Sequence, residues 1–190
     1  MPRLVLIAAL LTLLAACGGP AALQPPAEPI ANTALDLVLD APSSAGFEVE
    51  TNAAEDLRLR WPGDDESPAA SLAFAVGEDE ISLNLVEYVK GQEADLDSRP
   101  GGDFLGQLEL GSHIGPAFIT RGRFTGDDGN ELEETKIFAS HPDPETDRVL
   151  TITYVYPPSP GSTQARREQA LSALGLVQIP GAEPTEESGG

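Results

Sequence analysis

The sequence predicts an α+β fold, in which an antiparallel sheet of about five to seven strands is covered by a C-terminal helix. Short segments alternate apolar with polar residues, as half-buried strands do. Two long segments pair like residues with like around a turn-rich loop, and one amphipathic helix follows them. We expect a single folded domain over residues 32–179, which is long enough to bury one core.

The first half of this domain carries short strand signals. Residues 35–39 form an apolar-rich run, and residues 47–50 and 56–61 indicate further strands, the latter alternating apolar with charged side chains. Residues 71–76 and 80–89 then predict a hairpin around a Gly-Glu-Asp turn. The apolar faces of its two strands are Leu72, Phe74 and Val76 on one, and Ile81, Leu83 and Leu85 on the other.

A three-strand antiparallel meander follows. Residues 117–125 and 131–140 flank a loop of Gly, Asp and Asn. If Thr125 faces Glu131, every cross-strand pair considered joins like residues or opposite charges, as a correct register should. These pairs are Phe124 with Leu132, Arg123 with Glu133, Ile119 with Ile137, and Phe118 with Phe138. A third strand over residues 148–156 continues the apolar face with Leu150, Ile152 and Tyr154.

One well-patterned helix closes the domain. Ser162 or Thr163 caps its start, and it runs to about Leu174. Its apolar stripe is Ala170, Leu171 and Leu174. Gly175 suits the left-handed position that ends many helices, with Leu176 folding back onto Leu171. A second, weaker helix is expected within residues 91–109, around Phe104, Leu105 and Leu108.

The N-terminus has the features of an export signal. Arg3 supplies a positive charge, and residues 4–14 form an apolar run that is too short to span a bilayer. The Leu-Ala-Ala-Cys segment that ends at Cys17 resembles the lipobox of bacterial lipoproteins. That resemblance implies a signal peptide over residues 1–16, and diacylglycerol and palmitate chains on Cys17. An ordinary secretory signal with an incidental cysteine is the alternative.

Two flanking segments have linker composition. Residues 17–31 contain the lipidated cysteine and a proline-rich tether that holds the domain away from the membrane. Residues 180–190 predict a disordered acidic tail. The lipoprotein resemblance implies a lipid-anchored protein of the bacterial cell envelope. With Gly18 after the cysteine, it implies the outer membrane facing the periplasm in a diderm host.

Charge and cysteine content exclude several function classes. The chain holds 31 Asp+Glu against 11 Lys+Arg, a net charge of −20, which repels nucleic acid. Lys90 and Lys136 are the only lysines, so the sequence has no polybasic patch for anionic lipid headgroups. A single cysteine excludes an intramolecular disulfide framework and a cysteine-based zinc site.

Catalytic and metal-binding motifs are not recognisable. His113 and His141 have no partner at the spacing of a helical metal motif, and both are expected in surface turns. Two turn-rich acidic clusters offer oxygen ligands of the kind that calcium prefers, but Asp, Asn and Gly also suit turns by themselves. The clusters are Asp127, Asp128, Asn130 and Glu131, and Asp143, Glu145 and Asp147. We therefore predict no catalytic residues, no metal and no cofactor.

Four aromatic residues lie at strand positions, where core packing is commoner than a ligand groove. They are Trp61, Tyr88, Tyr154 and Tyr156. The order of elements, from two early strands through a hairpin and a meander to a helix ending Ser172-Ala173-Leu174-Gly175, resembles the PsbP-like α/β sandwich family. That resemblance covers roughly residues 45–178 and implies a binding or accessory protein without catalysis.

The sequence thus favours a non-enzymatic, lipid-anchored envelope protein that acts as a binding or assembly module. Its acidity either keeps tethered domains apart or steers a basic protein partner to an acidic face. Two alternatives stay open: an envelope hydrolase with a carboxylate-based site, and an immunity-type inhibitor of a secreted toxin.

Overall fold

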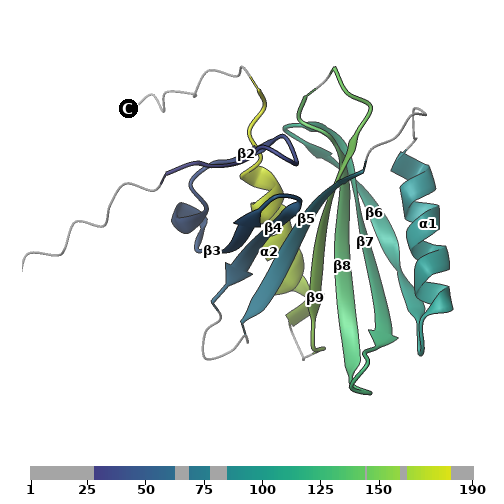
Figure 1. Cartoon of the computed structure of the whole chain (residues 1–190). Coiled ribbons are helices and arrows are strands. Elements are labelled where there is room, and N and C mark those ends of the chain that lie inside the picture. The colour runs from purple at the N-terminus through teal and green to yellow at the C-terminus, as the bar shows by residue number, and fades with distance from the viewer. Residues whose placement is uncertain (1–27, 63–68, 78–84, 144, 159–161, 181–190) are drawn as a thin grey trace, which may run out of the picture.

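The computed structural model describes residues 28–62, 69–77, 85–143, 145–158 and 162–180 (Figure 1). Its centre is a seven-stranded antiparallel sheet in the order β3-β4-β5-β9-β8-β7-β6, and β1 and β2 form a separate two-stranded sheet. The strands are β1 (Ile30–Asn32), β2 (Leu37–Leu39), β3 (Glu48–Ala53), β4 (Asp56–Trp61), β5 (Ala70–Gly77), β6 (Asp103–Ser112), β7 (Gly115–Thr125), β8 (Glu131–Ser140) and β9 (Val149–Tyr156). The helices are the 3-10 helix η1 (Pro42–Ala45) and the α-helices α1 (Leu85–Ser98) and α2 (Ser162–Gly175). The α+β class and the C-terminal helix are as predicted.

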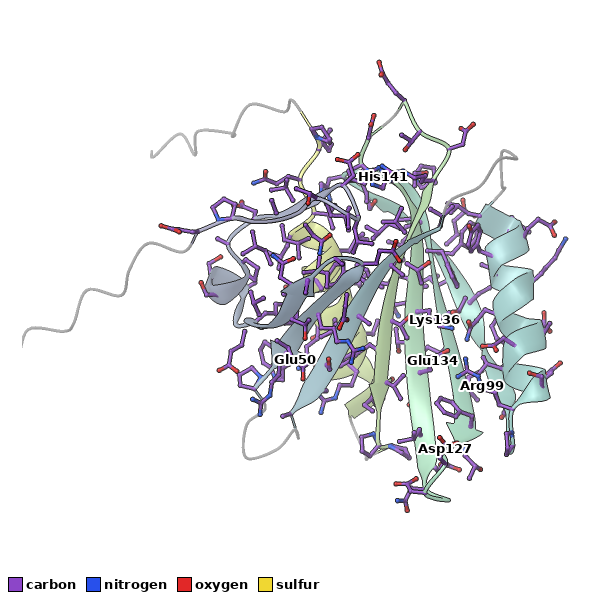
Figure 2. All side chains as sticks on the ribbon, in the orientation of Figure 1. Glu50, Arg99, Asp127, Glu134, Lys136 and His141 are labelled. Carbon is purple, nitrogen blue, oxygen red and sulfur yellow. The ribbon has the colours of Figure 1, made fainter. Side chains whose placement is uncertain are left out.

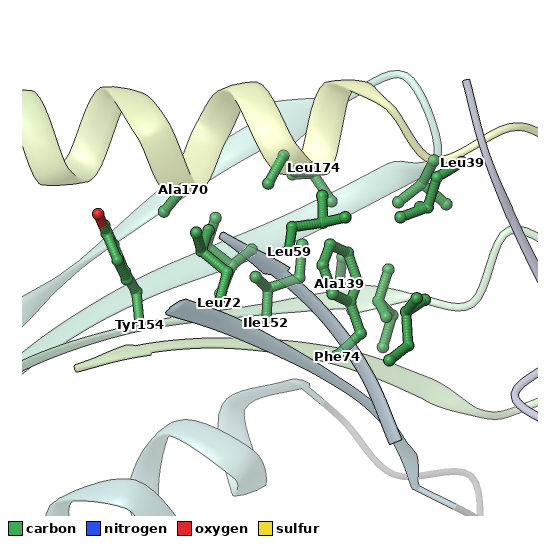
Figure 3. Close-up of a cluster of buried hydrophobic side chains, with 14 of the residues drawn as sticks. Leu39, Leu59, Leu72, Phe74, Ala139, Ile152, Tyr154, Ala170 and Leu174 are labelled. Carbon is green, nitrogen blue, oxygen red and sulfur yellow. The ribbon is translucent and has the colours of Figure 1, made fainter. Parts of the chain in front are cut away.

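The main core lies between the sheet and α2 (Figure 3). Alternate residues of the central strands point to this inner face, and each fully buried Leu or Ile side chain contributes about 1.5–3 kcal/mol. Residues that meet there include Leu39, Leu59, Leu72, Phe74, Ala139, Ile152, Tyr154, Ala170 and Leu174. The β1–β2 hairpin closes one end of this core, because Leu39 forms a bridge with Val177 just after α2.

Helix α1 lies on the outer face of the sheet, opposite the face that α2 covers (Figure 1). It contacts β6, β7 and β8 and leaves the outer face of β3, β4 and β5 uncovered by any helix of the described chain. Its apolar residues form a small second cluster: Val89 packs with Phe138 and Val149, and Leu85, Tyr88, Phe104 and Phe118 pack against these three. Leu96 fits over Gly122, where a Cβ atom would come within 2.2 Å of the leucine. Gly122 therefore allows the helix to approach the sheet closely.

The predicted meander register is confirmed. Phe124 pairs with Leu132, Ile119 with Ile137, and Ile137 in turn with Ile152 of β9. Two ion pairs between β7 and β8 run diagonally, however. Glu133 lies opposite Arg123 in the register, but its carboxylate is 3.6 Å from Arg121. The meander also has a fourth strand that the sequence did not predict, because β6 precedes β7 as the edge of the sheet.

Two of the predicted secondary-structure elements are wrong. Residues 85–89 begin helix α1 instead of completing a hairpin strand, and β5 pairs with β4 and β9. The remainder of that predicted strand, residues 80–84, lies outside the described residues. The weaker helix predicted around Phe104, Leu105 and Leu108 is also wrong, because these residues form β6. Helix α1 lies earlier in the chain, where Val89, Gln92 and Leu96 follow helical spacing.

The ends of the domain differ in detail from the predictions. Gly175 is the last residue of α2 and does not adopt a left-handed conformation. The chain leaves the helix through i→i+3 bonds instead, from the Leu176 and Val177 amides to Ala173 and Leu174. Strand β1 begins at Ile30, within the stretch expected as tether. The signal peptide, Cys17, the side chains of Ser162 and Thr163, and residues 181–190 lie outside the described residues.

Candidate functional site

A groove runs between α1 and β8 on the outer face of the sheet. It encloses a pocket of about 470 Å³, within the range typical of ligand sites. Its wall on α1 is Glu87, Tyr88, Gly91, Gln92 and Asp95, and its floor on β8 is Lys136 and Phe138. Gly91 has no side chain, and no atom lies within 4 Å of the position that its Cβ would take. The centre of this wall is therefore open.

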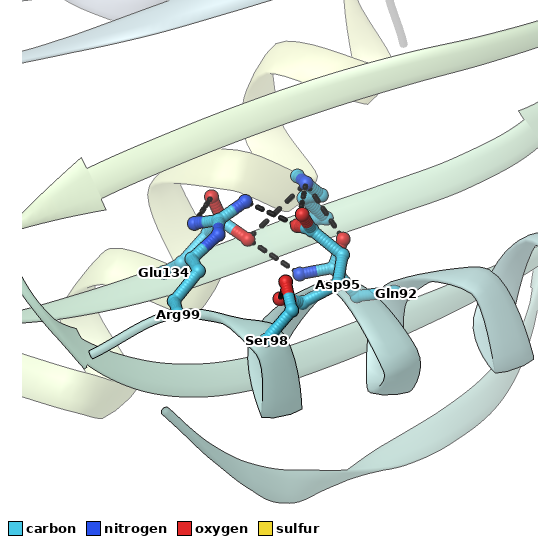
Figure 4. Close-up of polar contacts among 6 residues, drawn as sticks. Gln92, Asp95, Ser98, Arg99 and Glu134 are labelled. Atoms are coloured by element: carbon cyan, nitrogen blue, oxygen red, sulfur yellow. Dashed lines mark hydrogen bonds and ion pairs between the residues drawn. The ribbon is translucent and has the colours of Figure 1, made fainter. Parts of the chain in front are cut away.

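A buried polar network forms the base of this groove (Figure 4). The Glu134 side chain on β8 is 4 % exposed, and its two oxygens accept hydrogen bonds from Gln92 and Arg99, the first at 2.5 Å and the second at 3.3 Å. Lys136 Nζ lies 3.3 Å from the same carboxylate and donates to Gln92 Oε1 at 2.6 Å. Asp95 completes the network by pairing with Arg99.

The charges of the network neutralise one another. Partial burial alone would lower the pKa of Arg99, but the carboxylates of Glu134 and Asp95 outweigh it and raise that pKa above its ordinary value. The Arg99 guanidinium also lies 4.7 Å from the centre of the Phe124 ring. Two cations and two carboxylates therefore fix α1 to the sheet at its C-terminal half, where the apolar contact is limited.

Beyond the groove, the outer face of the sheet continues without a helix above it (Figure 2). Small and β-branched residues line it, with Ala73 opposite Thr153 and Ala75 opposite Thr151. Val155 is 36 % exposed on the same face. At the far strand, Glu50 of β3 accepts a hydrogen bond from Ser71. Helix α1 and this open surface thus form a corner, with the pocket along its inner edge.

The structure separates the four aromatic residues named from the sequence. Tyr154 and Tyr156 are buried in the main core, with ring centres 5.3 Å apart. Trp61 packs edge-on against Phe47 at 5.6 Å. Tyr88 alone of the four lines the pocket, where its ring centre is 5.7 Å from that of Phe138. Core packing therefore explains three of them, and a groove position explains the fourth.

The two histidines also differ. His113 is exposed, as predicted, and its Nε2 lies 2.6 Å from the Val177 carbonyl oxygen. The prediction of a surface position is wrong for His141, which is 3 % exposed. Its Nδ1 accepts a hydrogen bond from the Asp143 amide at 3.2 Å, and Nε2 lies 3.3 Å from the Leu35 carbonyl oxygen. The neutral form with hydrogen on Nε2 satisfies both contacts.

Acid is expected to destabilise the protein through His141. Burial lowers its pKa, and although the Leu35 carbonyl and the carboxylates of Asp36 and Asp143 favour the charged form, Arg148 adds to the lowering. Below pH about 6.5 the unfolded chain binds a proton that the folded chain resists, so this contribution to stability is lost as the pH falls from there to the folded pKa. One proton limits the slope to about 1.4 kcal/mol per pH unit.

Urea unfolding at pH 7.5, 6 and 5 measures this effect. His141→Asn keeps an acceptor near the Nδ1 position, and it should lose less stability on acidification than the original chain. His113→Asn, which changes the exposed histidine, should retain the original pH dependence. Equal acid dependence in His141→Asn and the original chain would contradict the assignment.

The acidic turns are organised by their own backbones. Asp128 accepts hydrogen bonds from the Asn130 amide and side chain, which lower its pKa, and Asp143 accepts one from the Glu145 amide. Within the described residues, no three His, Cys, Asp or Glu side chains gather closely enough to hold a metal ion. Asp127 and His141 mark the two turns, which lie at opposite ends of the sheet (Figure 2).

Apart from Tyr88, the sequence did not single out the residues of the groove. Glu134 and Lys136 belong to the run Glu133-Glu134-Thr135-Lys136 on β8, which has no apolar alternation and marks neither side as buried, but α1 covers them. A signal was present in α1, where Gln92 interrupts the apolar spacing between Val89 and Leu96 and faces the polar residues of β8.

Comparisons with known proteins inform the fold only. No family model matches the chain, and no curated protein sequence matches it. Among solved structures it is similar to PA94 of Pseudomonas aeruginosa, a protein of unknown function and proposed regulator, with a TM-score of 0.52 and 16 % identity over 67 % of this chain and 83 % of that one. It is also similar to the Ran-binding protein Mog1p of Saccharomyces cerevisiae, with a TM-score of 0.51 and 10 % identity over 75 % of this chain and 89 % of Mog1p. None of the helices in the described ranges is long and apolar enough to cross a membrane.

Proposed function

We propose that this protein is a lipid-anchored, non-enzymatic module of the bacterial envelope that binds a basic protein partner. The lipid on Cys17 would hold it at the membrane, and the corner between α1 and the open sheet face would receive the partner. The observation that carries the binding role is the pocket of about 470 Å³ at this corner, where the rings of Tyr88 and Phe138 lie beside the carboxylates of Glu87 and Asp95. Mog1p, which has a similar fold, is itself a protein-binding protein.

The charge of α1 favours a cationic partner. The helix carries Glu87, Glu93, Asp95 and Asp97 against a single lysine. Glu87 and Asp95 stand at the pocket with side chains 55 % and 45 % exposed, so each can accept a second cation besides its present partner, Lys90 for Glu87 and Arg99 for Asp95. A partner Arg or Lys side chain that enters there would meet these carboxylates and the faces of Tyr88 and Phe138, and both contacts attract cations.

Carboxylate chemistry fits this groove poorly. A glycosidase requires one carboxyl group that is held protonated and a second that is free to act. Glu134 instead uses both of its oxygens to accept hydrogen bonds from Gln92 and Arg99, so neither oxygen is free to act on a substrate. The buried His141 uses both ring nitrogens for backbone contacts. A binding module therefore accounts for the arrangement better than a hydrolase.

Site-specific photo-cross-linking in cells tests the docking site. A photoreactive residue replaces Ala75, which is exposed on the open face, and a second variant carries it at Glu168 on the exposed side of α2. We expect one dominant cross-linked protein from position 75 and none from position 168. The captured protein should be basic, and its binding to the purified domain should weaken as salt rises.

Charge reversal on α1 provides the matched control. Glu87→Lys changes the pocket wall and should reduce the cross-link at least about fivefold, a coupling typical of a close charge pair. Glu93→Lys makes the same change on the same helix away from the pocket and should leave most of the signal. Equal yields from the two variants would contradict docking in the groove. Absence of a specific cross-link from position 75 would contradict a protein-binding role for this face.

A further inference from the structure

The far edge of the sheet, on β6, combines two features that recognise an extended chain. Within the described residues β6 pairs with β7 alone, so one side of this strand presents backbone N–H and C=O groups without partners in the sheet. A bulge at Phe104/Gly106 bends the strand, and Gly106 adopts a φ of 128°. From Gln107 to Ser112 the pairing with β7 is regular, which leaves a straight edge for another strand.

A second, smaller pocket lies beside this edge, on the α2 side of the sheet. Its volume is about 190 Å³, below the roughly 300–1,000 Å³ of sites for drug-sized molecules. Leu105, Leu108 and Ile119 supply apolar walls, and Leu108 is 43 % exposed. The pocket is thus suited to one apolar side chain rather than to a whole small molecule.

Two arginines complete this pocket, although the chain has only 11 Lys+Arg against 31 acidic residues. Arg167 of α2 is exposed and forms no ion pair with another described residue. Arg121 of β7 lies 3.6 Å from Glu133, and its buried Nε has no hydrogen-bond partner among the described residues. The pocket lining thus holds two guanidinium groups and no Asp or Glu among the described residues, so it is locally positive in an acidic protein.

We propose that this edge binds the C-terminus of an extended polypeptide. The terminal carboxylate would pair with Arg121 and Arg167, and the last side chain, which is apolar, would enter between Leu105, Leu108 and Ile119. The preceding residues would add to β6 as an antiparallel or parallel strand. A free C-terminus carries the anion, the apolar group and the backbone donors together, which is the combination that the edge offers. This site is independent of the groove under α1, since it lies on the other face of the sheet.

Three small probes separate the elements of this recognition. N-acetyl-leucine is a minimal free C-terminus, N-acetyl-leucinamide removes its charge, and hexanoate keeps an apolar carboxylate without a peptide group. Titrations are followed by backbone amide NMR of the folded domain. We expect N-acetyl-leucine to shift the backbone amide signals of residues 105–108 in a saturable way. N-acetyl-leucinamide should bind about tenfold more weakly. The tetrapeptide Ac-Ala-Ala-Ala-Leu, as a free acid, should bind more tightly than N-acetyl-leucine because it pairs along β6.

Variants at exposed arginines give the control. Arg167→Gln removes one guanidinium from the pocket and should weaken N-acetyl-leucine about tenfold. Arg58→Gln makes the same change on β4, near the opposite edge of the sheet, and should have no effect. Equal affinity for the acid and the amide, or for the two variants, would overturn the carboxylate site. Hexanoate binding as tightly as the tetrapeptide would overturn recognition of a polypeptide end.

Discussion

Cys17→Ser is expected to shift the protein from the membrane to the soluble fraction and to abolish its labelling by a clickable fatty acid. Attached acyl chains bury many methylene groups at about 0.8 kcal/mol each, and two or more chains suffice for stable anchoring. The rest of the chain offers little to replace them, because a net charge of −20 repels the anionic headgroups that hold many peripheral proteins. Fractionation of cells with immunoblotting measures the shift.

An uncleaved signal sequence is the main complication of this test. A second variant therefore replaces residues 1–17 with a cleavable secretory signal, so that the domain is released without any apolar leader. This variant should be soluble, whereas Gly18→Ala, which retains Cys17, should remain with the membrane. Membrane retention of the variant with the cleavable signal, or fatty-acid labelling of Cys17→Ser, would contradict lipid anchoring through Cys17.

Replacing Glu134 by alanine is expected to lower the free energy of unfolding by about 3 kcal/mol, because it removes one partner from a buried ionic network. Gln92 would lose its acceptor and Arg99 would keep only Asp95. Lys136 would keep only Gln92 and the more distant Asp95, at 3.8 Å. Helix α1 depends on this network for much of its contact with β8. Urea unfolding at neutral pH measures the loss.

Two companion variants make this result specific. Glu131→Ala removes a carboxylate that is 55 % exposed on the same strand, and it should cost less than about 1 kcal/mol. Glu134→Gln keeps acceptor and donor groups without the charge and should fall between the two. A loss for Glu134→Ala as small as that for Glu131→Ala would show that the network contributes little to holding α1.

Much of the sheet was predictable because the apolar pattern of its strands determines how they pair. Ile119, Ile137 and Ile152 lie in one row across β7, β8 and β9, and a shift by one residue would turn each of them outward. Strand β6 was not predictable in this way. As an edge strand with partly exposed Leu105 and Leu108, it has no alternation that distinguishes it from a helix.

The groove was harder to predict, because its polar residues on β8 are covered by a separate element, helix α1. Glu134 and Lys136 stand in a run of four consecutive polar residues, and only the position of α1 shows that they are covered. The helix itself has a mixed surface in which Gln92 takes a core position. Apolar periodicity in a sequence indicates burial against apolar surroundings. A helix that packs on charged residues therefore has only a weak periodic pattern. His141 is similar, because its burial depends on the distant Leu35 carbonyl.

The backbone contacts between β2 and the residues after α2 affect the order in which the molecule can fold. The amide of Asp40 donates to the carbonyl of Leu176, and that of Gln178 to the carbonyl of Val38, so β2, besides pairing with β1, is held by the last residues of the domain. Likewise β5, formed early in the chain, has β9 as a neighbour in the sheet. A chain that emerges N-terminus first from a ribosome or a membrane channel must therefore keep its first strands incomplete until its C-terminal helix has appeared. During that interval its apolar inner faces require protection from other emerging chains.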